Sequence, residues 1–412
     1  MKNENEKNKN EKLSRSRTVN IEVESAVPEN PYYLKVAKRY RTLKYLSLAA
    51  LVFYILAMLV MHRSQITYEN LVYLAKDLNT DADASAALFD EIKYDESRKM
   101  SAAIYKGRLA VATTTSFTIY NTTGSVERSF KISMENPKVV SGDKYVMVYD
   151  VGGTTYSLYT TIMCVFSGQT QYTLQGAAIS DTGEFALISR ARENRYNVTL
   201  YDSNFKELTR IYKDKYVLDV ALSADGTRYA VASCEMTGSA VSGEVMSGRV
   251  DSEGASTTSI SDSLPLEAGF FRDGSFCVVG DDTVSFFAPS GELVTEKRLD
   301  GYGVTGISMS GSGVMIVESR NLIDTRSSAT VYASDGTEAL SVTVYSKVSA
   351  CALGEDAAYV AAGGVLTRYR ASADPESVDC PFIVQTLVPY SGNVLVMGST
   401  SAVTGFSASG AE

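Results

Sequence analysis

The feature that most constrains this chain is a strand–turn–strand unit that recurs eight times between residues 100 and 400. Each unit places short apolar strands on both sides of a Ser/Asp/Gly turn, as in ISDTGEFALIS and LSADGTRYAVAS. The turns are centred at Gly107, Gly142, Gly183, Gly226, Gly274, Gly313, Glu355 and Gly392, at intervals of 35 to 48 residues. Such turns between apolar runs are typical of β-hairpins. Recurrence at this period predicts a ring or array of similar units.

A second turn follows each of the first seven units, and further strands flank it. The strands before it include SFTIY, NVTLY, TVSFF and ATVYA. Four short antiparallel strands in about forty residues are the blade of a β-propeller. We therefore predict an all-β fold, with a β-propeller over residues 88–412. Eight four-stranded blades are favoured, and seven blades are the alternative.

The eighth unit stops before its fourth strand. It runs through VLVMGS and AVTGF to a turn at residues 407–410. A ring does not close stably with an unpaired strand edge in its last blade. The segment Phe89–Tyr94 alternates like a strand. We predict that it supplies the missing outer strand, so that deleting residues 86–96 unfolds or aggregates the domain.

An apolar run, Tyr45–Met61, precedes the repeats. Its 17 residues exceed the usual apolar region of a signal peptide, and no small-residue cleavage site follows. We predict a transmembrane helix over residues 45–61, with a buried core helix as the alternative. Basic residues crowd its N-terminal side, which predicts a cytoplasmic N-terminus and an extracytoplasmic propeller. These basic residues are Lys35, Lys38, Arg39, Arg41 and Lys44.

The charge of the chain is divided between its two parts. Residues 1–44 hold eleven basic and six acidic residues, and we predict a basic cytoplasmic tail that is mostly disordered. Residues 62–87 are predicted to form a stalk helix and a linker. Residues 64–412 hold 27 basic and 42 acidic residues, a net charge of −15. An acidic domain repels nucleic acid, so we predict no nucleic-acid partner.

The residue types needed for several kinds of catalysis are missing. The only histidine is His62, and the chain has no tryptophan. Histidine-dependent nucleophilic catalysis and His-ligated metal sites are therefore excluded from the predicted propeller. We predict a protein that is not an enzyme, with no catalytic, cofactor-binding or metal-binding residues and no cofactor.

Cysteines and turn aspartates have simple structural interpretations. The five cysteines show no CxxC or zinc spacing, and we interpret them as small buried apolar residues, with one disulfide left open. They are Cys164, Cys234, Cys277, Cys351 and Cys380.

The turn aspartates could form a calcium-binding ring, but turn formation explains their recurrence better. They are Asp143, Asp181, Asp225, Asp273 and Asp356.

The S-x-D-G-x-apolar turns of ISDTGEFALIS and LSADGTRYAVAS resemble those of the WD40/YVTN/TolB-like and quinoprotein-like propellers. The whole layout, over roughly residues 30–412, is similar to an uncharacterised family of single-pass bacterial membrane proteins. This resemblance implies a location and a fold, and it supplies no catalytic residues. The missing tryptophan and histidine argue against quinone-dependent or metal-dependent activity.

Two functional hypotheses follow. The first is a membrane-anchored propeller that serves as a protein or peptide interaction scaffold, or as a sensor module, in the cell envelope. The Ser/Gly/Thr-rich segment 238–260 is its candidate contact region, predicted as a long flexible hairpin. The alternative is a carboxylate-dependent glycan hydrolase or lyase, which requires two carboxylates that converge on the propeller axis.

Overall fold

The computed structural model describes residues 31–61, 89–94, 99–192, 195–238, 240–252, 254–260, 263–300, 303–319, 325–371 and 373–406. The chain divides into two units, Met1–Ala75 and Lys76–Glu412. Residues 1–30 of the predicted tail, and the predicted stalk and linker over residues 62–87, lie outside the described residues. Residues 31–44 of the tail are helical rather than disordered.

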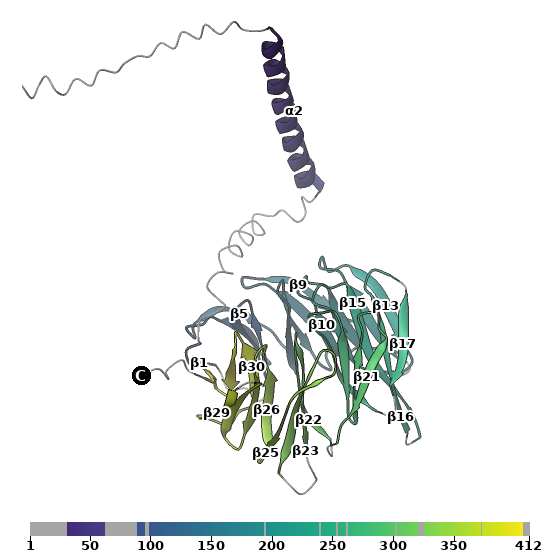
Figure 1. The fold of residues 1–412 in the computed structure, drawn as a ribbon, viewed down its shortest axis with the longest axis vertical. Coiled ribbons are helices and arrows are strands. Elements are labelled where there is room, and N and C mark those ends of the chain that lie inside the picture. Colours follow the sequence, from purple (N-terminus) through teal and green to yellow (C-terminus); the bar gives the residue numbers. More distant parts are fainter. Residues whose placement is uncertain are drawn as a thin grey trace, which may run out of the picture. The chain divides into compact units, whose positions relative to one another are not determined.

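The first unit contains helix α2 (Pro31–Met61), drawn in purple in Figure 1. The helix begins well before Tyr45 because Pro31 suits a first helical turn, where its missing N–H has no partner to lose. The Leu, Ala, Lys and Arg residues that follow are good helix formers. No helix among the described residues is long and apolar enough to cross a membrane. The predicted span over residues 45–61 lies within α2, but its transmembrane role gains no support from the structure.

The second unit is an eight-bladed β-propeller, as predicted from the turns (Figure 1). Blades 1 to 4 are β2 (Ser101–Tyr105), β3 (Arg108–Ala112), β4 (Ser116–Tyr120), β5 (Val126–Lys131); β6 (Pro137–Ser141), β7 (Val146–Asp150), β8 (Thr155–Tyr159), β9 (Cys164–Gln169); β10 (Leu174–Ile179), β11 (Phe185–Arg190), β12 (Tyr196–Tyr201), β13 (Glu207–Lys213); and β14 (Tyr216–Leu222), β15 (Arg228–Thr237), β16 (Ala240–Arg249), β17 (Ala255–Ile260).

Blades 5 to 8 are β18 (Pro265–Phe270), β19 (Phe276–Gly280), β20 (Thr283–Phe287), β21 (Leu293–Arg298); β22 (Val304–Ser310), β23 (Gly313–Ser319), β24 (Ser327–Ala333), β25 (Glu338–Val344); β26 (Val348–Leu353), β27 (Ala358–Ala362), β28 (Val365–Arg370), β29 (Ala373–Asp379); and β30 (Thr386–Tyr390), β31 (Asn393–Met397), β32 (Ser401–Thr404) with β1 (Ile92–Lys93). Every sheet of the described residues has four antiparallel strands. The alternative of seven blades is thereby excluded.

Blade 8 closes the ring with strands from both ends of the domain. Strand β1 pairs with β32, so that Ile92 lies opposite Ala402 and Lys93 opposite Ser401. The sequence prediction for Phe89–Tyr94 is therefore confirmed. The Tyr94 hydroxyl lies 2.8 Å from the carbonyl oxygen of Gly398 and 2.7 Å from that of Ser401, which fixes the closing strand on the blade.

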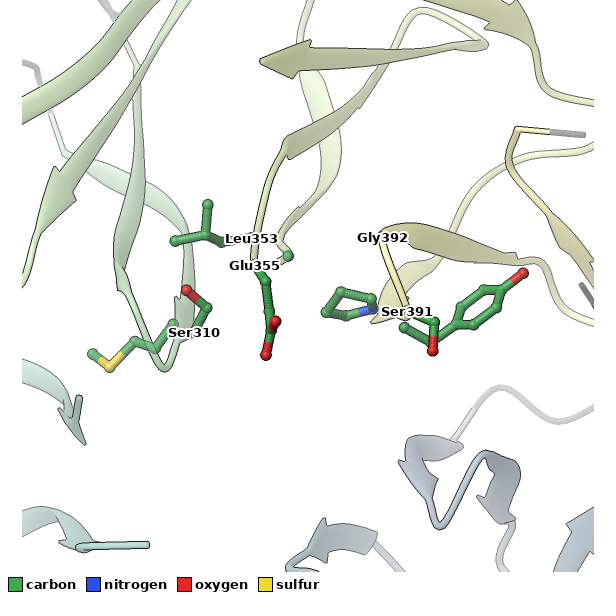
Figure 2. Close-up of a pocket in the computed structure, with 9 residues that line it drawn as sticks. Ser310, Leu353, Glu355, Ser391 and Gly392 are labelled. Atoms are coloured by element: carbon green, nitrogen blue, oxygen red, sulfur yellow. The ribbon is translucent and has the colours of Figure 1, made fainter. Parts of the chain in front are cut away.

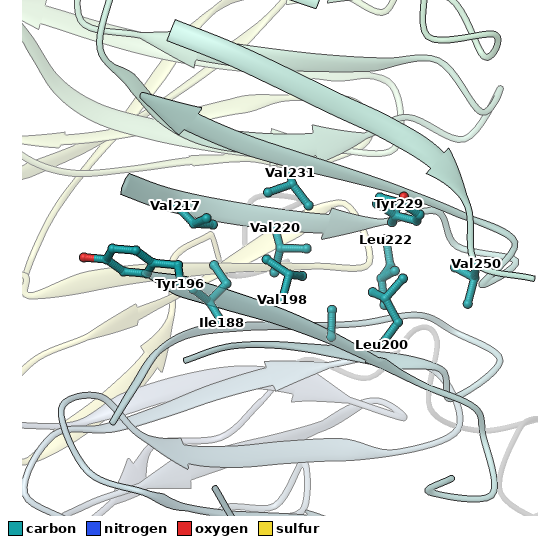
Figure 3. Packing of buried hydrophobic residues seen from close by; sticks show 11 residues of the cluster. Ile188, Tyr196, Val198, Leu200, Val217, Val220, Leu222, Tyr229, Val231 and Val250 are labelled. Atoms are coloured by element: carbon teal, nitrogen blue, oxygen red, sulfur yellow. The ribbon is translucent and has the colours of Figure 1, made fainter. Parts of the chain in front are cut away.

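The core of the propeller is a ring of eight apolar clusters, each between two neighbouring blades. Figure 3 shows the cluster between blades 3 and 4, where Ile188 and Val198 of one blade face Val220 and Val231 of the next. Second strands are buried on both faces because each blade has two packed neighbours; all five residues of β7 are buried. This explains their continuous apolar runs.

Candidate functional site

The first strands of the blades converge on the propeller axis, where successive first strands contact one another. In blades 3 to 7 the pairing of the first strand with the second shifts by one residue, as in a β-bulge. A bulge turns one extra residue away from the ladder. Five exposed side chains result, at corresponding positions near the start of each first strand. They are Gln175, Leu218, Leu266, Thr305 and Ser349.

An acidic pair lies next to two of these bulges. Asp219 and Glu267 are partly buried on neighbouring first strands, β14 and β18. The Asp219 Oδ2 accepts a hydrogen bond of 2.8 Å from the backbone N–H of Ala268. Asp219 thereby satisfies an inner-strand amide that no further strand pairs with. Glu267 accepts no hydrogen bond from the described residues.

Burial changes the ionisation of both carboxyl groups. Burial raises the pKa of Asp219 to about 6, although the backbone amides of Ala268 and Val220 act to lower it. Burial, together with the neighbouring Asp219, raises the pKa of Glu267 to about 7. Near pH 7 the pair therefore holds between one and two negative charges, and perturbed ionisation of this kind is concentrated at functional sites.

Two thiols and a phenol surround this pair. Cys277 is fully buried, and burial together with Glu267 raises the pKa of its thiol. The same causes raise the pKa of Cys351 to about 11. Burial and Asp219 raise the pKa of Tyr149 to about 12. These groups are neutral at physiological pH and add no further negative charge to the acidic pair.

The two ends of the propeller differ in their exposed apolar side chains. We call the end with the turns between first and second strands the first-turn end, and the end with the connections between blades the connection end. Ten large apolar side chains of the described propeller residues are exposed, and seven lie at the connection end. These seven are Tyr212, Tyr216, Leu218, Met236, Leu266, Tyr345 and Ile383. The first five belong to blades 3 to 5, and blades 4 and 5 also carry the acidic pair.

A cavity of about 380 Å³ lies at the first-turn end, between the first turns of blades 6, 7 and 8. Figure 2 shows Glu355 between the turn at Ser310 and the turn at Ser391–Gly392. The Glu355 carboxylate pairs with the Arg272 guanidinium of blade 5. Serine hydroxyls without an adjacent base do not form an activated nucleophile. This cavity therefore has no recognisable catalytic arrangement.

Two of the five turn aspartates, Asp225 and Asp273, accept hydrogen bonds within their own turns, as predicted. The Asp225 Oδ1 accepts hydrogen bonds from the Ser223 hydroxyl at 2.6 Å and the Thr227 N–H at 3.0 Å. Asp273 accepts one from the Ser275 N–H at 2.9 Å. No group of three metal-ligating side chains occurs among the described residues.

All five cysteines are free. Cys234 and Cys277 are buried and the other three are partly buried, which matches their interpretation as small apolar residues. The Ser/Gly/Thr-rich segment 238–260 contributes two strands to blade 4, the ten-residue β16 and the outer strand β17. A long hairpin is present as predicted, since ten residue pairs join β15 to β16 from Arg228 to Thr237. Its flexibility stays a prediction.

The sequence could not place the acidic pair together. Asp219 and Glu267 are far apart in the chain, and both positions depend on bulges that shift the strand register. Leu218-Asp219 and Leu266-Glu267 do share an apolar–acidic pattern at the same place in their repeats. Alignment of the repeats on this pattern is the one signal that could have revealed the site.

The fold and its sites define an eight-bladed β-propeller without a recognised catalytic motif. The chain belongs to the family of unknown function DUF5711, whose model matches residues 85–373. No functionally curated protein matches the sequence.

Solved structures share the fold at low sequence identity. Sqt1 from Saccharomyces cerevisiae is 8% identical with a TM-score of 0.57, over 78% of this chain and 98% of Sqt1. BamB from Moraxella catarrhalis is 11% identical with a TM-score of 0.52, over 78% of this chain and 99% of BamB. The Dos1 propeller is 7% identical with a TM-score of 0.56, over 77% of this chain and 94% of that propeller. At these identities the likeness establishes the fold alone.

Proposed function

We propose that this protein is an interaction module whose propeller binds a protein partner at the connection end of blades 3 to 5. The observation that carries the proposal is the gathering of Tyr212, Tyr216, Leu218, Met236 and Leu266 there. Exposed apolar side chains grouped on one face mark interaction sites more often than scattered ones do. The acidic residues Asp219 and Glu267, each next in sequence to Leu218 or Leu266, add a preference for partners with basic side chains.

The test removes apolar side chains at one end and compares the result with matched changes at the other. The variant carries Tyr212→Ser, Leu218→Ser and Met236→Ser. The control carries Val126→Ser, Leu208→Ser and Val294→Ser, which are exposed beside the outer turns of the first-turn end. Crosslinked cells are subjected to affinity purification and mass spectrometry. Partner recovery is expected to fall at least tenfold in the variant alone; equal recovery would count against the proposal.

We further propose that the module is tethered to the cell membrane, with the propeller on the extracytoplasmic side. The support is in the sequence: the apolar run over residues 45–61 and the basic residues before it. The expected result is that full-length protein sediments with membranes and resists extraction by carbonate. A version without residues 45–61 is expected in the supernatant. Equal sedimentation of both forms would refute the tether.

A second candidate function, glycan hydrolysis or elimination by carboxylates, is favoured by one observation. Asp219 and Glu267 lie on neighbouring inner strands and differ in pKa, about 6 against about 7. A partly protonated acid beside an ionised carboxylate is the pairing that glycosidases use. Release of reducing ends from cell-envelope glycans that disappears in Glu267→Gln would establish this activity. Absence of release by the unmodified protein would remove it.

A further inference from the structure

Blade 4 differs from every other blade in its middle strands. Strands β15 and β16 have ten residues each, whereas the second and third strands of the other blades have four to seven. The outer strand β17 pairs only with Gly243–Gly248 of β16. Residues Ala240–Ser242 of β16 therefore pair with β15 but have no outer partner among the described residues. The edge of β16 that faces outward therefore extends three residues, Ala240–Ser242, beyond the part that pairs with β17.

The composition of β17 is also unlike that of most outer strands. Its sequence is ASTTSI, with no charge and no proline, and only Ile260 is buried. Outer strands β5, β13, β21 and β29 carry three charged residues each, and β29 also carries Pro375. Charges and proline on an edge strand prevent pairing with other chains. Strand β17 lacks both forms of protection.

Strand β9 is the other six-residue outer strand without charge, and it provides a comparison. Its side chains at Cys164, Val165 and Phe166 are partly covered. Phe166 stacks on Phe205 of the neighbouring blade, with ring centroids 4.8 Å apart. Among the described residues no aromatic contact covers β17, whose first three residues are exposed. Exposure and lack of charge therefore coincide at β17.

We propose that the edge of β17 accepts an extended, net-basic segment of a partner protein as a fifth strand of blade 4. This rests on the proposed interaction function and names how one partner is held. Main-chain hydrogen bonds along the edge supply affinity, and the exposed hydroxyls of Thr257 and Ser259 supply polar cross-strand contacts. The chain from residue 64 onwards has a net charge of −15, which attracts a basic segment and repels a second copy of itself.

The test uses photocrosslinking from the full-length protein in the cells that make it. A benzophenone amino acid replaces Ala255, Thr257 or Ser259, which alternate onto one face of the strand. The control position is Val294, which is exposed on the charged outer strand β21. We expect one partner segment, net-basic in sequence, whose crosslinked residue moves two positions for each two-residue step along β17. Yields equal to the control, crosslinks without this stepping, or crosslinks to a second copy would overturn the proposal.

A pair of variants tests the edge itself. Thr257→Lys with Ser259→Lys adds repulsive charge to the edge, while Thr257→Val with Ser259→Val keeps it neutral. Both sites are solvent-exposed, so melting temperatures should stay close to that of the unmodified protein. Crosslinking from residue 255 is expected to fall at least tenfold in the lysine variant and to persist in the valine variant.

The outcomes also separate this site from the proposed function. The variant with Tyr212→Ser, Leu218→Ser and Met236→Ser could lose its partner while the lysine variant retains it. That result would support the proposed interaction function and refute the site at the edge of β17. Loss of the partner in both variants supports both. Retention in both overturns both.

Discussion

At the scale of residues, the least compensated groups of the propeller are the carboxyls of Asp219 and Glu267. No basic side chain pairs with either of them among the described residues. Each raised pKa means that the folded protein holds a proton more tightly than the unfolded chain does. The two protonated carboxyl groups therefore contribute their full stabilisation of the fold below pH 4. This stabilisation is lost as the pH rises through about 7, where the carboxyl groups ionise in the folded protein.

We therefore predict that Glu267→Gln stabilises the protein at pH 8. Glutamine has nearly the same shape and carries no charge, so it removes the cost of an ionised carboxylate in this position. The gain is on the order of 2–3 kcal/mol at pH 8 and shrinks toward zero at pH 4. Urea unfolding at both pH values measures it. Glu355→Gln, at an exposed carboxylate of the first-turn end, is the control; a Glu267→Gln effect that is independent of pH would contradict this origin.

Residue roles were predictable from the sequence where they depend on neighbours in the chain. Asp225 accepts its hydrogen bonds from residues two positions away on either side, so the repeated turn pattern was enough to assign it. Glu267 acquires its raised pKa from burial and from Asp219 of the neighbouring blade, and it in turn raises the pKa of the Cys277 and Cys351 thiols. Composition and spacing carry no information on which side chains the closed ring brings together.

At the scale of elements, the weakest unit is expected to be blade 8, because its outer strand β1 has only two paired residues. Its attachment depends on side chains around it. Phe89 packs edge to face on Tyr390, with ring centroids 4.9 Å apart, and the Thr404 hydroxyl donates to the Phe89 carbonyl at 2.8 Å. Tyr94 adds the hydroxyl contacts to Gly398 and Ser401.

We predict that Tyr94→Phe lowers the free energy of unfolding by about 1–2 kcal/mol, since it removes the hydroxyl next to the buried Gly398 carbonyl oxygen and creates no cavity. Denaturant unfolding followed by circular dichroism measures this loss. The matched control is Tyr212→Phe, at an exposed tyrosine. An unchanged midpoint for Tyr94→Phe would show that the hydroxyl plays no part in closing the ring.

Element boundaries followed the sequence in most blades because each strand is short and ends at a polar turn. Blade 4 is the exception, since the Ser/Gly/Thr composition of residues 238–260 did not mark the bounds of β16 and β17. Small polar side chains give little strand preference by themselves. The backbone ladder with β15, whose apolar residues are anchored in two cores, holds them in register.

At the scale of the whole molecule, the ring has one interlocked seam and seven covalent connections. Each pair of neighbouring blades shares an apolar cluster, and only blade 8 combines strands from both ends of the domain. Opening the ring at blade 8 therefore requires breaking the β1–β32 pairing as well as separating side chains. If the ring were instead opened between two complete blades, only side-chain packing would hold those two blades together.

This difference leads to a prediction for a circular permutant of the domain. The permutant joins Phe406 to Phe89 through a Gly/Ser linker and begins at Lys347, between β25 and β26. Thr404 and Phe89 are already hydrogen-bonded, so a short linker reaches. We expect the permutant to form the same eight blades but to unfold at least tenfold faster than the unpermuted domain, because its new ends separate two complete blades with no shared sheet. Unfolding rates in denaturant, extrapolated to water, measure the difference. A second permutant is opened within blade 8, between β30 and β31, so that this blade still combines strands from both ends of the chain. It should unfold more slowly than the first permutant. Equal unfolding rates for the two would show that the shared blade does not govern the opening of the ring.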